Sequence, residues 1–213
     1  MLQCIHMELL ARLLGGIERV KIMRFFLHHE DQLFTSGDVL DKTKSKGAFA
    51  KKELTALASL GFIEKKKAKM VVTTGGKKGT SRIKEVSGYK LNGEFPHNAA
   101  LKELLFDFQL VDKKELAARF KAIGRIKLFI VAGVFTSDPK SRLDILVVGE
   151  AIKRPKAEKI FEGISAEIGR DVVYSMMDIE EYEYRIKMYD KFIRDVLEMP
   201  HEKVIDKLSK EVK

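Results

Sequence analysis

Tryptophan is absent from the 213-residue sequence, cysteine occurs once and proline four times. The lone Cys4 cannot form an internal disulfide, which excludes a small scaffold held together by disulfides. The scarcity of proline excludes collagen-like and proline-rich disordered classes, and 45% hydrophobic residues can supply a core. The composition is therefore that of an ordinary globular protein, with room for one large domain or two small ones.

Long apolar runs are also missing. The longest, residues 128–134 and 143–148, are too short to cross a bilayer and indicate buried strands. Residues 1–16 lack a basic start before an apolar stretch and a small-residue cleavage site. We therefore expect no membrane partner and a cytoplasmic protein, although a single cysteine is also compatible with secreted proteins.

Positive charge is concentrated in one part of the sequence. The formal net charge is +9; residues 1–95 hold 18 basic against 10 acidic side chains, and residues 96–213 hold 22 against 21. From Lys42 to Lys84 there are 13 basic residues and only two acidic ones. So concentrated a positive field attracts a polyanion, and nucleic acid is the most common one inside cells. On charge alone, a basic surface kept for solubility is the alternative.

The N-terminal part of the sequence has the spacing of three helices. Apolar side chains at steps of three and four predict a helix over residues 17–29. Thr35 and Ser36 can cap a second helix through residues 38–40, because a hydroxyl accepts a hydrogen bond from an orphan backbone N–H. The polar segment 43–47 predicts a turn before a third helix. We expect the core face of this third helix to consist of Phe49, Leu54, Leu57 and Leu60.

A β-hairpin is predicted next. Two extended runs, residues 62–73 and 81–91, flank the segment 74–80, whose glycines allow a tight tip and whose lysines leave it exposed. Three helices and a basic hairpin follow the order of a winged helix-turn-helix, in which the third helix enters the major groove of DNA and the hairpin contacts phosphates. On this interpretation the DNA-binding residues are Lys42, Lys44, Ser45, Lys46, Lys51 and Lys52 near the third helix, and Lys77, Lys78, Arg82 and Lys84 in the hairpin.

A second domain is expected after residue 95, so that the chain divides into residues 1–95 and 96–213. Strands separated by helical or loop crossovers indicate a small mixed sheet covered by helices, and an α+β protein overall. The predicted segments, after two initial helical pieces, are strands at 125–132, 143–148 and 171–177, a helix at 155–168 and an amphipathic helical tail over 179–208.

Residues 126–149 resemble the core motif of the nucleotidyltransferase superfamily: a strand, Gly-Ser, a loop, and a strand that begins with two aspartates one residue apart and ends in a glycine. The resemblance implies that Gly-Ser holds nucleotide phosphates in active members. It also implies that the aspartates bind Mg²⁺ with a third carboxylate on a later strand, because hard cations require oxygen ligands. Gly133 matches the glycine, and Asp144 matches the second aspartate.

The motif departs from the superfamily pattern at three positions. Val134 replaces the serine, and Arg142 replaces the first aspartate. The third carboxylate position falls near Val173, where Asp171 is the only nearby acid. One carboxylate beside a fixed positive charge binds Mg²⁺ poorly, so we expect no catalytic residues, no metal site and no cofactor. We expect Arg142 and Asp144 to form a surface ion pair or, alternatively, to hold an anionic ligand.

The complete arrangement resembles a family of prokaryotic winged-helix transcriptional regulators fused to a degenerate nucleotidyltransferase-like domain. The resemblance covers most of residues 17–208 and extends into the tail at 181–182 and 190–195. It implies sequence-specific binding of double-stranded DNA by a homodimer, with the second domain used for dimerisation or ligand sensing. Two alternatives remain open. One is an active nucleotidyltransferase that acts on a small molecule, a protein or an RNA end; the other is a sensor of a small-molecule or nucleotide effector that the sequence does not identify.

Other groups of reactive residues do not form a recognised site. The five histidines are scattered, with no zinc-ligand spacing. The segment 75–79 lacks the spacing of a phosphate-binding P-loop and the hydroxyl residue that follows its lysine. Aromatic and methionine residues within 174–189 have spacings that suit sheet and helix packing, so we expect them in the core or at a dimer surface.

Overall fold

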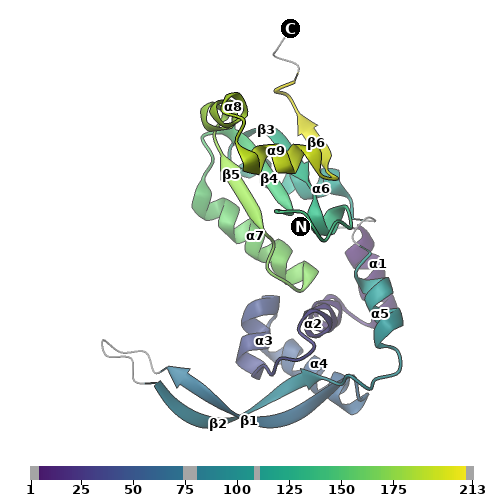
Figure 1. Ribbon diagram of the computed structural model, residues 1–213. Helices are drawn as coiled ribbons and strands as arrows, with labels where there is room; N and C mark the ends of the chain where they lie inside the picture. The colour runs from purple at the N-terminus through teal and green to yellow at the C-terminus, as the bar shows by residue number, and fades with distance from the viewer. Residues whose placement is uncertain (1–4, 74–80, 108–110, 210–213) are drawn as a thin grey trace.

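The computed structural model describes residues 5–73, 81–107 and 111–209. It is an α+β protein: N-terminal helices with a two-stranded hairpin precede a mixed four-stranded sheet with helices. Figure 1 shows the sheet and its helices above the N-terminal helices, with the hairpin below them. The expected class is therefore confirmed. Within the described ranges, no helix is both long enough and apolar enough to cross a bilayer.

The first half contains the helices and hairpin that the sequence predicts and one helix that it did not. The unpredicted helix is the first; its buried side chains, Met7, Leu10 and Ala11, lie at helical steps of three and four. In chain order the elements are α1 (Ile5–Leu14), α2 (Ile17–His28), α3 (Ser36–Thr43), α4 (Gly47–Ser59), β1 (Ile63–Thr73), β2 (Ser81–Leu91) and α5 (Asn98–Leu105).

The start of α3 is fixed by the predicted cap. The Thr35 hydroxyl accepts a hydrogen bond from the backbone N–H of Asp38 at 3.2 Å, and the Asp38 carboxylate accepts one from the backbone N–H of Thr35 at 2.8 Å. This reciprocal capping box satisfies two backbone donors that the first helical turn leaves without partners. Lys44 ends the helix in the left-handed conformation, with φ of 50°.

The buried face of α4 differs from the predicted one. Ala50, Leu54 and Leu57 are buried, whereas Phe49 and Leu60 keep 63% and 62% of their surface exposed. The prediction that Phe49 and Leu60 line the core was wrong. Steps of four and three place residues 50, 54 and 57 in one stripe, but the sequence reasoning favoured the large apolar side chains over the small alanine.

The hairpin is joined at its base to the chain that precedes α3. Strands β1 and β2 pair antiparallel, from Ile63 opposite Leu91 outwards. Phe34 forms an isolated bridge to Tyr89, in which each backbone N–H donates to the other residue's carbonyl, at 2.9 and 2.7 Å. A Cβ atom at Gly88 would lie 2.6 Å from the Phe34 carbonyl oxygen, so this close approach requires glycine.

The second half is built on a sheet with the strand order β5-β4-β3-β6. Strand β3 pairs antiparallel with β4 and β6, and β4 pairs parallel with β5. The elements in chain order are α6 (Lys113–Ala118), η2 (Arg119–Ala122), β3 (Arg125–Val131), η3 (Gly133–Phe135), β4 (Ile145–Glu150), α7 (Arg154–Ile168), β5 (Tyr174–Met177), α8 (Ile179–Lys187), α9 (Lys191–Glu198) and β6 (Glu202–Asp206).

The prediction of a helical tail through residue 208 was wrong in its last part. Helices α8 and α9 form as expected, but the chain then leaves the helix at Met199 and adds β6 to the sheet edge. Pro200 follows directly, and proline lacks the N–H that a helix needs. The short strand is less apolar than the predicted ones, so a search for buried strands missed it.

Side chains alternate between the two faces of the sheet and form two cores. Phe129 and Val131 of β3 pack with α6, η2 and α7, while Leu128 and Ile130 pack with α8 and α9. A separate core joins α1 to α5 with the base of the hairpin. The predicted boundary at residue 95 falls before α5, whose Leu105 belongs to this first core.

A buried arginine connects the two halves. Arg24 of α2 is 3% exposed; its Nε donates to the Leu105 carbonyl and its Nη1 to the Glu167 carbonyl, both at 2.8 Å. Gly169 ends α7 with φ of 92°, and a Cβ there would lie 2.7 Å from the Arg24 carbonyl carbon. Close packing of α2 against the end of α7 therefore places α3 beside α7, as Figure 1 shows.

Candidate functional site

The solvent face of α4 carries positive charge. Glu53, the only acidic residue of α4, is paired with Arg19 at 2.6 Å, and both side chains are largely buried. Lys46 occupies the N-cap and is exposed. The exposed residues along this side of the helix, which follow one another at helical steps, are Ala48, Lys51, Lys52, Thr55 and Ser59. The structure therefore places Lys51 and Lys52 on this open side of α4, and leaves Lys46 exposed at the N-terminal end of the helix.

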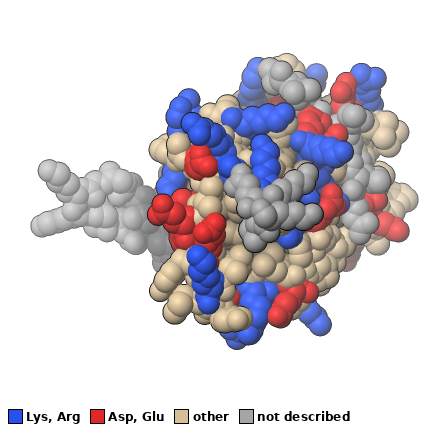
Figure 2. Space-filling view, turned by 90° about the horizontal axis from the view of Figure 1, so that it is seen from above, with Lys and Arg blue, Asp and Glu red and all other residues tan. Residues whose placement is uncertain are grey.

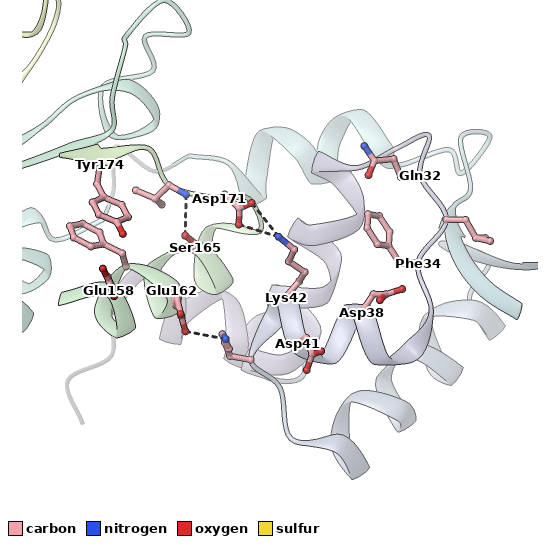
Figure 3. A pocket seen from close by; sticks show the side chains of 14 residues that line it. Gln32, Phe34, Asp38, Asp41, Lys42, Glu158, Glu162, Ser165, Asp171 and Tyr174 are labelled. Carbon is pink, nitrogen blue, oxygen red and sulfur yellow. Dashed lines mark hydrogen bonds and ion pairs between the residues drawn. The ribbon is translucent and has the colours of Figure 1, made fainter. Parts of the chain in front are cut away.

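Lys42 and Lys44 lie elsewhere, against the second half. The Lys42 ammonium is 3.2 Å from the Asp171 carboxylate, and the Lys44 ammonium is 3.1 Å from that of Glu162 (Figure 3). All four side chains are more than half exposed, so these pairs are exchangeable and sensitive to salt. They link the end of α3 to α7 and the loop that follows it.

Ser45 has a structural role in the turn between α3 and α4. Its hydroxyl donates to the Glu18 carboxylate and is 2.8 Å from the Thr43 hydroxyl. Its backbone N–H donates to the Leu40 carbonyl at 3.1 Å. These contacts fix the angle at which α4 leaves the turn.

The predicted hairpin contacts can be placed only in part. Lys77 and Lys78 lie outside the described residues. Arg82 and Lys84 belong to β2, where they pair with Val72 and Met70, but their side chains lie outside the described part. The sequence reasoning did not select three further lysines that are exposed on β1, although their charge run was visible: Lys65, Lys66 and Lys67.

The second half, at the end of the molecule away from the hairpin, carries charge of both signs. Figure 2 shows that face from above, with blue and red side chains interspersed over its described surface. This agrees with the near balance of basic and acidic residues in residues 96–213. The mixed charge of this face contrasts with the exposed lysines of α4 and β1.

In the second-half motif, Asp144 acts as a buried structural link. It is 3% exposed; one carboxylate oxygen accepts hydrogen bonds from the Val134 backbone N–H at 2.9 Å and from Arg170 Nη2 at 2.8 Å. The other oxygen accepts one from the Val173 backbone N–H at 3.0 Å. Gly133 approaches so closely that a Cβ would lie 2.3 Å from this carboxylate. Three of the roughly four lone-pair sites of the carboxylate are therefore directed at protein donors.

The other predicted motif residues do not gather around Asp144. Arg142 binds Asp195 of α9 through Nε at 2.7 Å, so the expected Arg142–Asp144 pair was wrong. Asp144 is paired instead with Arg170, which is more distant in the sequence, at 2.8 Å. Asp171 points instead to Lys42. Among the described residues, no group of three or more His, Cys, Asp or Glu side chains could hold a metal ion.

A cavity of about 570 Å³ lies beside this motif, where the two halves meet. Its walls include His28 and Phe106, whose rings stack at 4.1 Å, together with Asp138, Asp144 and Arg170. Burial, assisted by the positive charge of Arg170, lowers the pKa of His28 from 6.5 to about 4. His28 is therefore neutral at pH 7, and the cavity presents both apolar and charged groups to a bound molecule.

A larger cleft of about 930 Å³ separates α3 from α7 (Figure 3). Lys42 and Asp171 face each other across it. On the side of the second half, Tyr174 stacks on Phe161 with ring centroids 3.7 Å apart. The cleft therefore combines exposed charges on its rim with aromatic side chains in its wall.

The chain was compared with protein-family models, curated proteins and solved structures, and none of them matches.

Proposed function

We propose that this chain is a cytoplasmic, DNA-binding transcriptional regulator that works as a homodimer. Residues 1–95 are proposed to form a winged helix-turn-helix, and residues 96–213 a nucleotidyltransferase-like domain without catalytic activity. The observation that carries the proposal is the open lysine surface of α4, on which the only acidic residue of the helix is withdrawn into the Arg19–Glu53 pair. A surface of this kind is complementary to the phosphates that border a major groove.

The arrangement around α4 also supports this function. The turn held by Ser45 separates α3 from α4, and the hairpin base is tied to the chain before α3 by the Phe34–Tyr89 bridge. These contacts hold α4 and the hairpin in fixed positions relative to each other. Such an arrangement is needed if the helix is to contact a groove while the hairpin contacts the adjacent phosphate backbone. The hairpin also carries exposed lysines on β1, of which Lys66 lies 2.6 Å from the Glu64 carboxylate and Lys67 lies 4.0 Å from that of Glu85.

A non-catalytic second half is supported by the contacts of Asp144. Its carboxylate already accepts hydrogen bonds from two backbone N–H groups and Arg170. Incubation with labelled nucleotides and Mg²⁺ or Mn²⁺ tests the alternative of an active nucleotidyltransferase. We expect no transfer; transfer that Asp144→Ala abolishes would overturn this part of the proposal.

The DNA-binding proposal is tested with charge-removing variants of the exposed face of α4. The change is Lys51→Ala with Lys52→Ala, and the measurement is duplex affinity by fluorescence anisotropy over a range of salt concentrations. We expect weaker binding to every duplex and a salt slope about two units smaller for each bound protomer, since each lost phosphate contact reduces the slope by about one. Removal of Lys77 and Lys78 from the hairpin should have a similar effect.

The matched control is the double variant Lys187→Ala with Lys191→Ala, because these two exposed lysines lie on α8 and α9 of the second half. It should leave both affinity and salt slope unchanged. Equal losses in the control and in the α4 variant would show that binding follows overall charge and not the proposed surface.

A ligand-sensing role for the second half is a further candidate, favoured by the cavity beside Asp144 and Arg170. Its position against His28 would let an occupant influence the end of α2. A thermal-shift screen with nucleotides tests this role; a rise in melting temperature that Arg170→Ala removes is the expected result for a nucleotide effector. Absence of a shift with every nucleotide would count against it.

A further inference from the structure

Phe49 differs from the other phenylalanines of the chain. Among those in the described part, it alone is exposed, with 63% of its surface accessible. It lies near the N-terminal end of α4, three residues after Lys46 and three before Lys52. Side chains three apart on a helix are neighbours, so Phe49 adjoins Lys52, and Lys46 lies at the N-cap before it.

The positive surface of α4 explains affinity for phosphates but not the presence of an exposed aromatic ring at its edge. A phenyl ring offers no hydrogen bond to a phosphate or to a polar base edge. The apolar group that a base pair presents in the major groove is the 5-methyl group of thymine. Lys52 and the adjacent Lys51 would hold the phosphate backbone while the ring reaches the groove.

We propose that Phe49 contacts the 5-methyl group of a thymine and thereby determines part of the sequence preference of α4. This inference rests on the proposed DNA-binding function. It assigns sequence preference to Phe49, whereas the lysines contribute affinity for any duplex. The surrounding charge favours DNA over a second copy of the chain as the occupant. A symmetric contact between copies would place Lys46 and Lys52 near their own equivalents, which like-charge repulsion opposes.

The test uses duplexes selected by the wild-type protein from a random pool. Each thymine of the selected site is replaced in turn by uracil, which removes only the 5-methyl group. At one position in each half-site, we expect uracil to weaken wild-type binding about fourfold, the factor that corresponds to burial of one methyl-sized group. Phe49→Ala should bind the thymine duplex about as weakly as wild type binds the uracil duplex, and should not distinguish the two bases at that position.

Leu60→Ala is the matched control, since Leu60 is also an exposed apolar residue of this helix region, at its opposite end. It should retain the full preference for thymine. The inference is overturned if uracil has no effect at any position, or if Phe49→Ala keeps the wild-type preference. It is also overturned if Phe49→Ala alters only the oligomeric state, measured by size-exclusion chromatography with light scattering. In these cases duplex binding by wild type still supports the proposed function, whereas failure of wild type to select any duplex refutes that function itself.

Discussion

Replacing Asp144 by asparagine separates a structural role of this residue from a metal-binding one. The substitution keeps the shape of the side chain but turns one acceptor oxygen into an NH₂ group. That group must then face one of the three donors that now approach the carboxylate, namely the N–H groups of Val134 and Val173 and the Arg170 guanidinium. We therefore expect the variant to be less stable than wild type.

The size of the effect follows from the burial of Asp144, which is 3% exposed. A hydrogen bond to a charged group contributes about 1.5–3 kcal/mol, and a buried donor left without its acceptor costs a further amount of about 1–3 kcal/mol. Arg170 is one-third exposed, so water partly compensates its loss. We expect a fall of about 3 kcal/mol in unfolding free energy, and a melting temperature lower by about 6–12 °C for a chain of this length.

Thermal and urea unfolding with and without Mg²⁺ are the assays. Asp171→Asn is the control, because its side chain is 82% exposed and its pair with Lys42 is open to water. This control should cost less than about 1 kcal/mol. The reasoning fails if Asp144→Asn is as stable as wild type. It also fails if Mg²⁺ raises the melting temperature of wild type but not of the variant, since Asp144 would then be a metal ligand.

Three further outcomes are expected. Gly133→Ala should lower the urea midpoint, because its φ is 52° and the new Cβ would lie 2.3 Å from the Asp144 carboxylate; an unchanged midpoint would contradict the contact. The lowered pKa of His28, about 4 against an ordinary 6.5, means that the unfolded chain takes up a proton that the folded chain does not. Stability should therefore fall as pH drops from about 6.5 towards 4. His28→Phe should reduce this fall, measured as the difference in unfolding free energy in urea between pH 7 and pH 5. An equal fall in the variant and in wild type would refute the role of His28. Neutralising Glu162 and Asp171 together should strengthen duplex binding severalfold at low salt, because Lys42 and Lys44 then lose their competing carboxylates; unchanged affinity would show that these lysines do not contact DNA.

Local patterns in the sequence were sufficient for most of the first half. The Thr35 cap and the helices around it depend on residues a few positions apart, which a single sequence displays directly. The core residues of α4 could not be predicted in this way. The helix buries the small Ala50 and exposes the large Phe49. Size and hydrophobicity alone do not distinguish these two outcomes.

Long-range pairings in the second half could not be obtained in the same way. Asp144 has Arg142 two residues away, yet its partner is Arg170, while Arg142 binds Asp195. Both choices depend on how α7 and α9 pack on the sheet, which local spacing does not encode. Strand β6 was missed for a similar reason, since its pairing with β3 is determined by the sheet edge that the rest of the fold leaves open.

The most informative measurement is a titration of the purified full chain against a random-sequence duplex at several salt concentrations. With Lys46, Lys51 and Lys52 exposed along α4 and further lysines on the hairpin, about five phosphate contacts are expected for each protomer. The logarithm of the association constant should then fall linearly with the logarithm of salt concentration, with a slope of about −4 to −5 for each bound protomer. No binding at low salt, or an affinity independent of salt, would contradict the proposal that α4 and the hairpin form a DNA-binding surface.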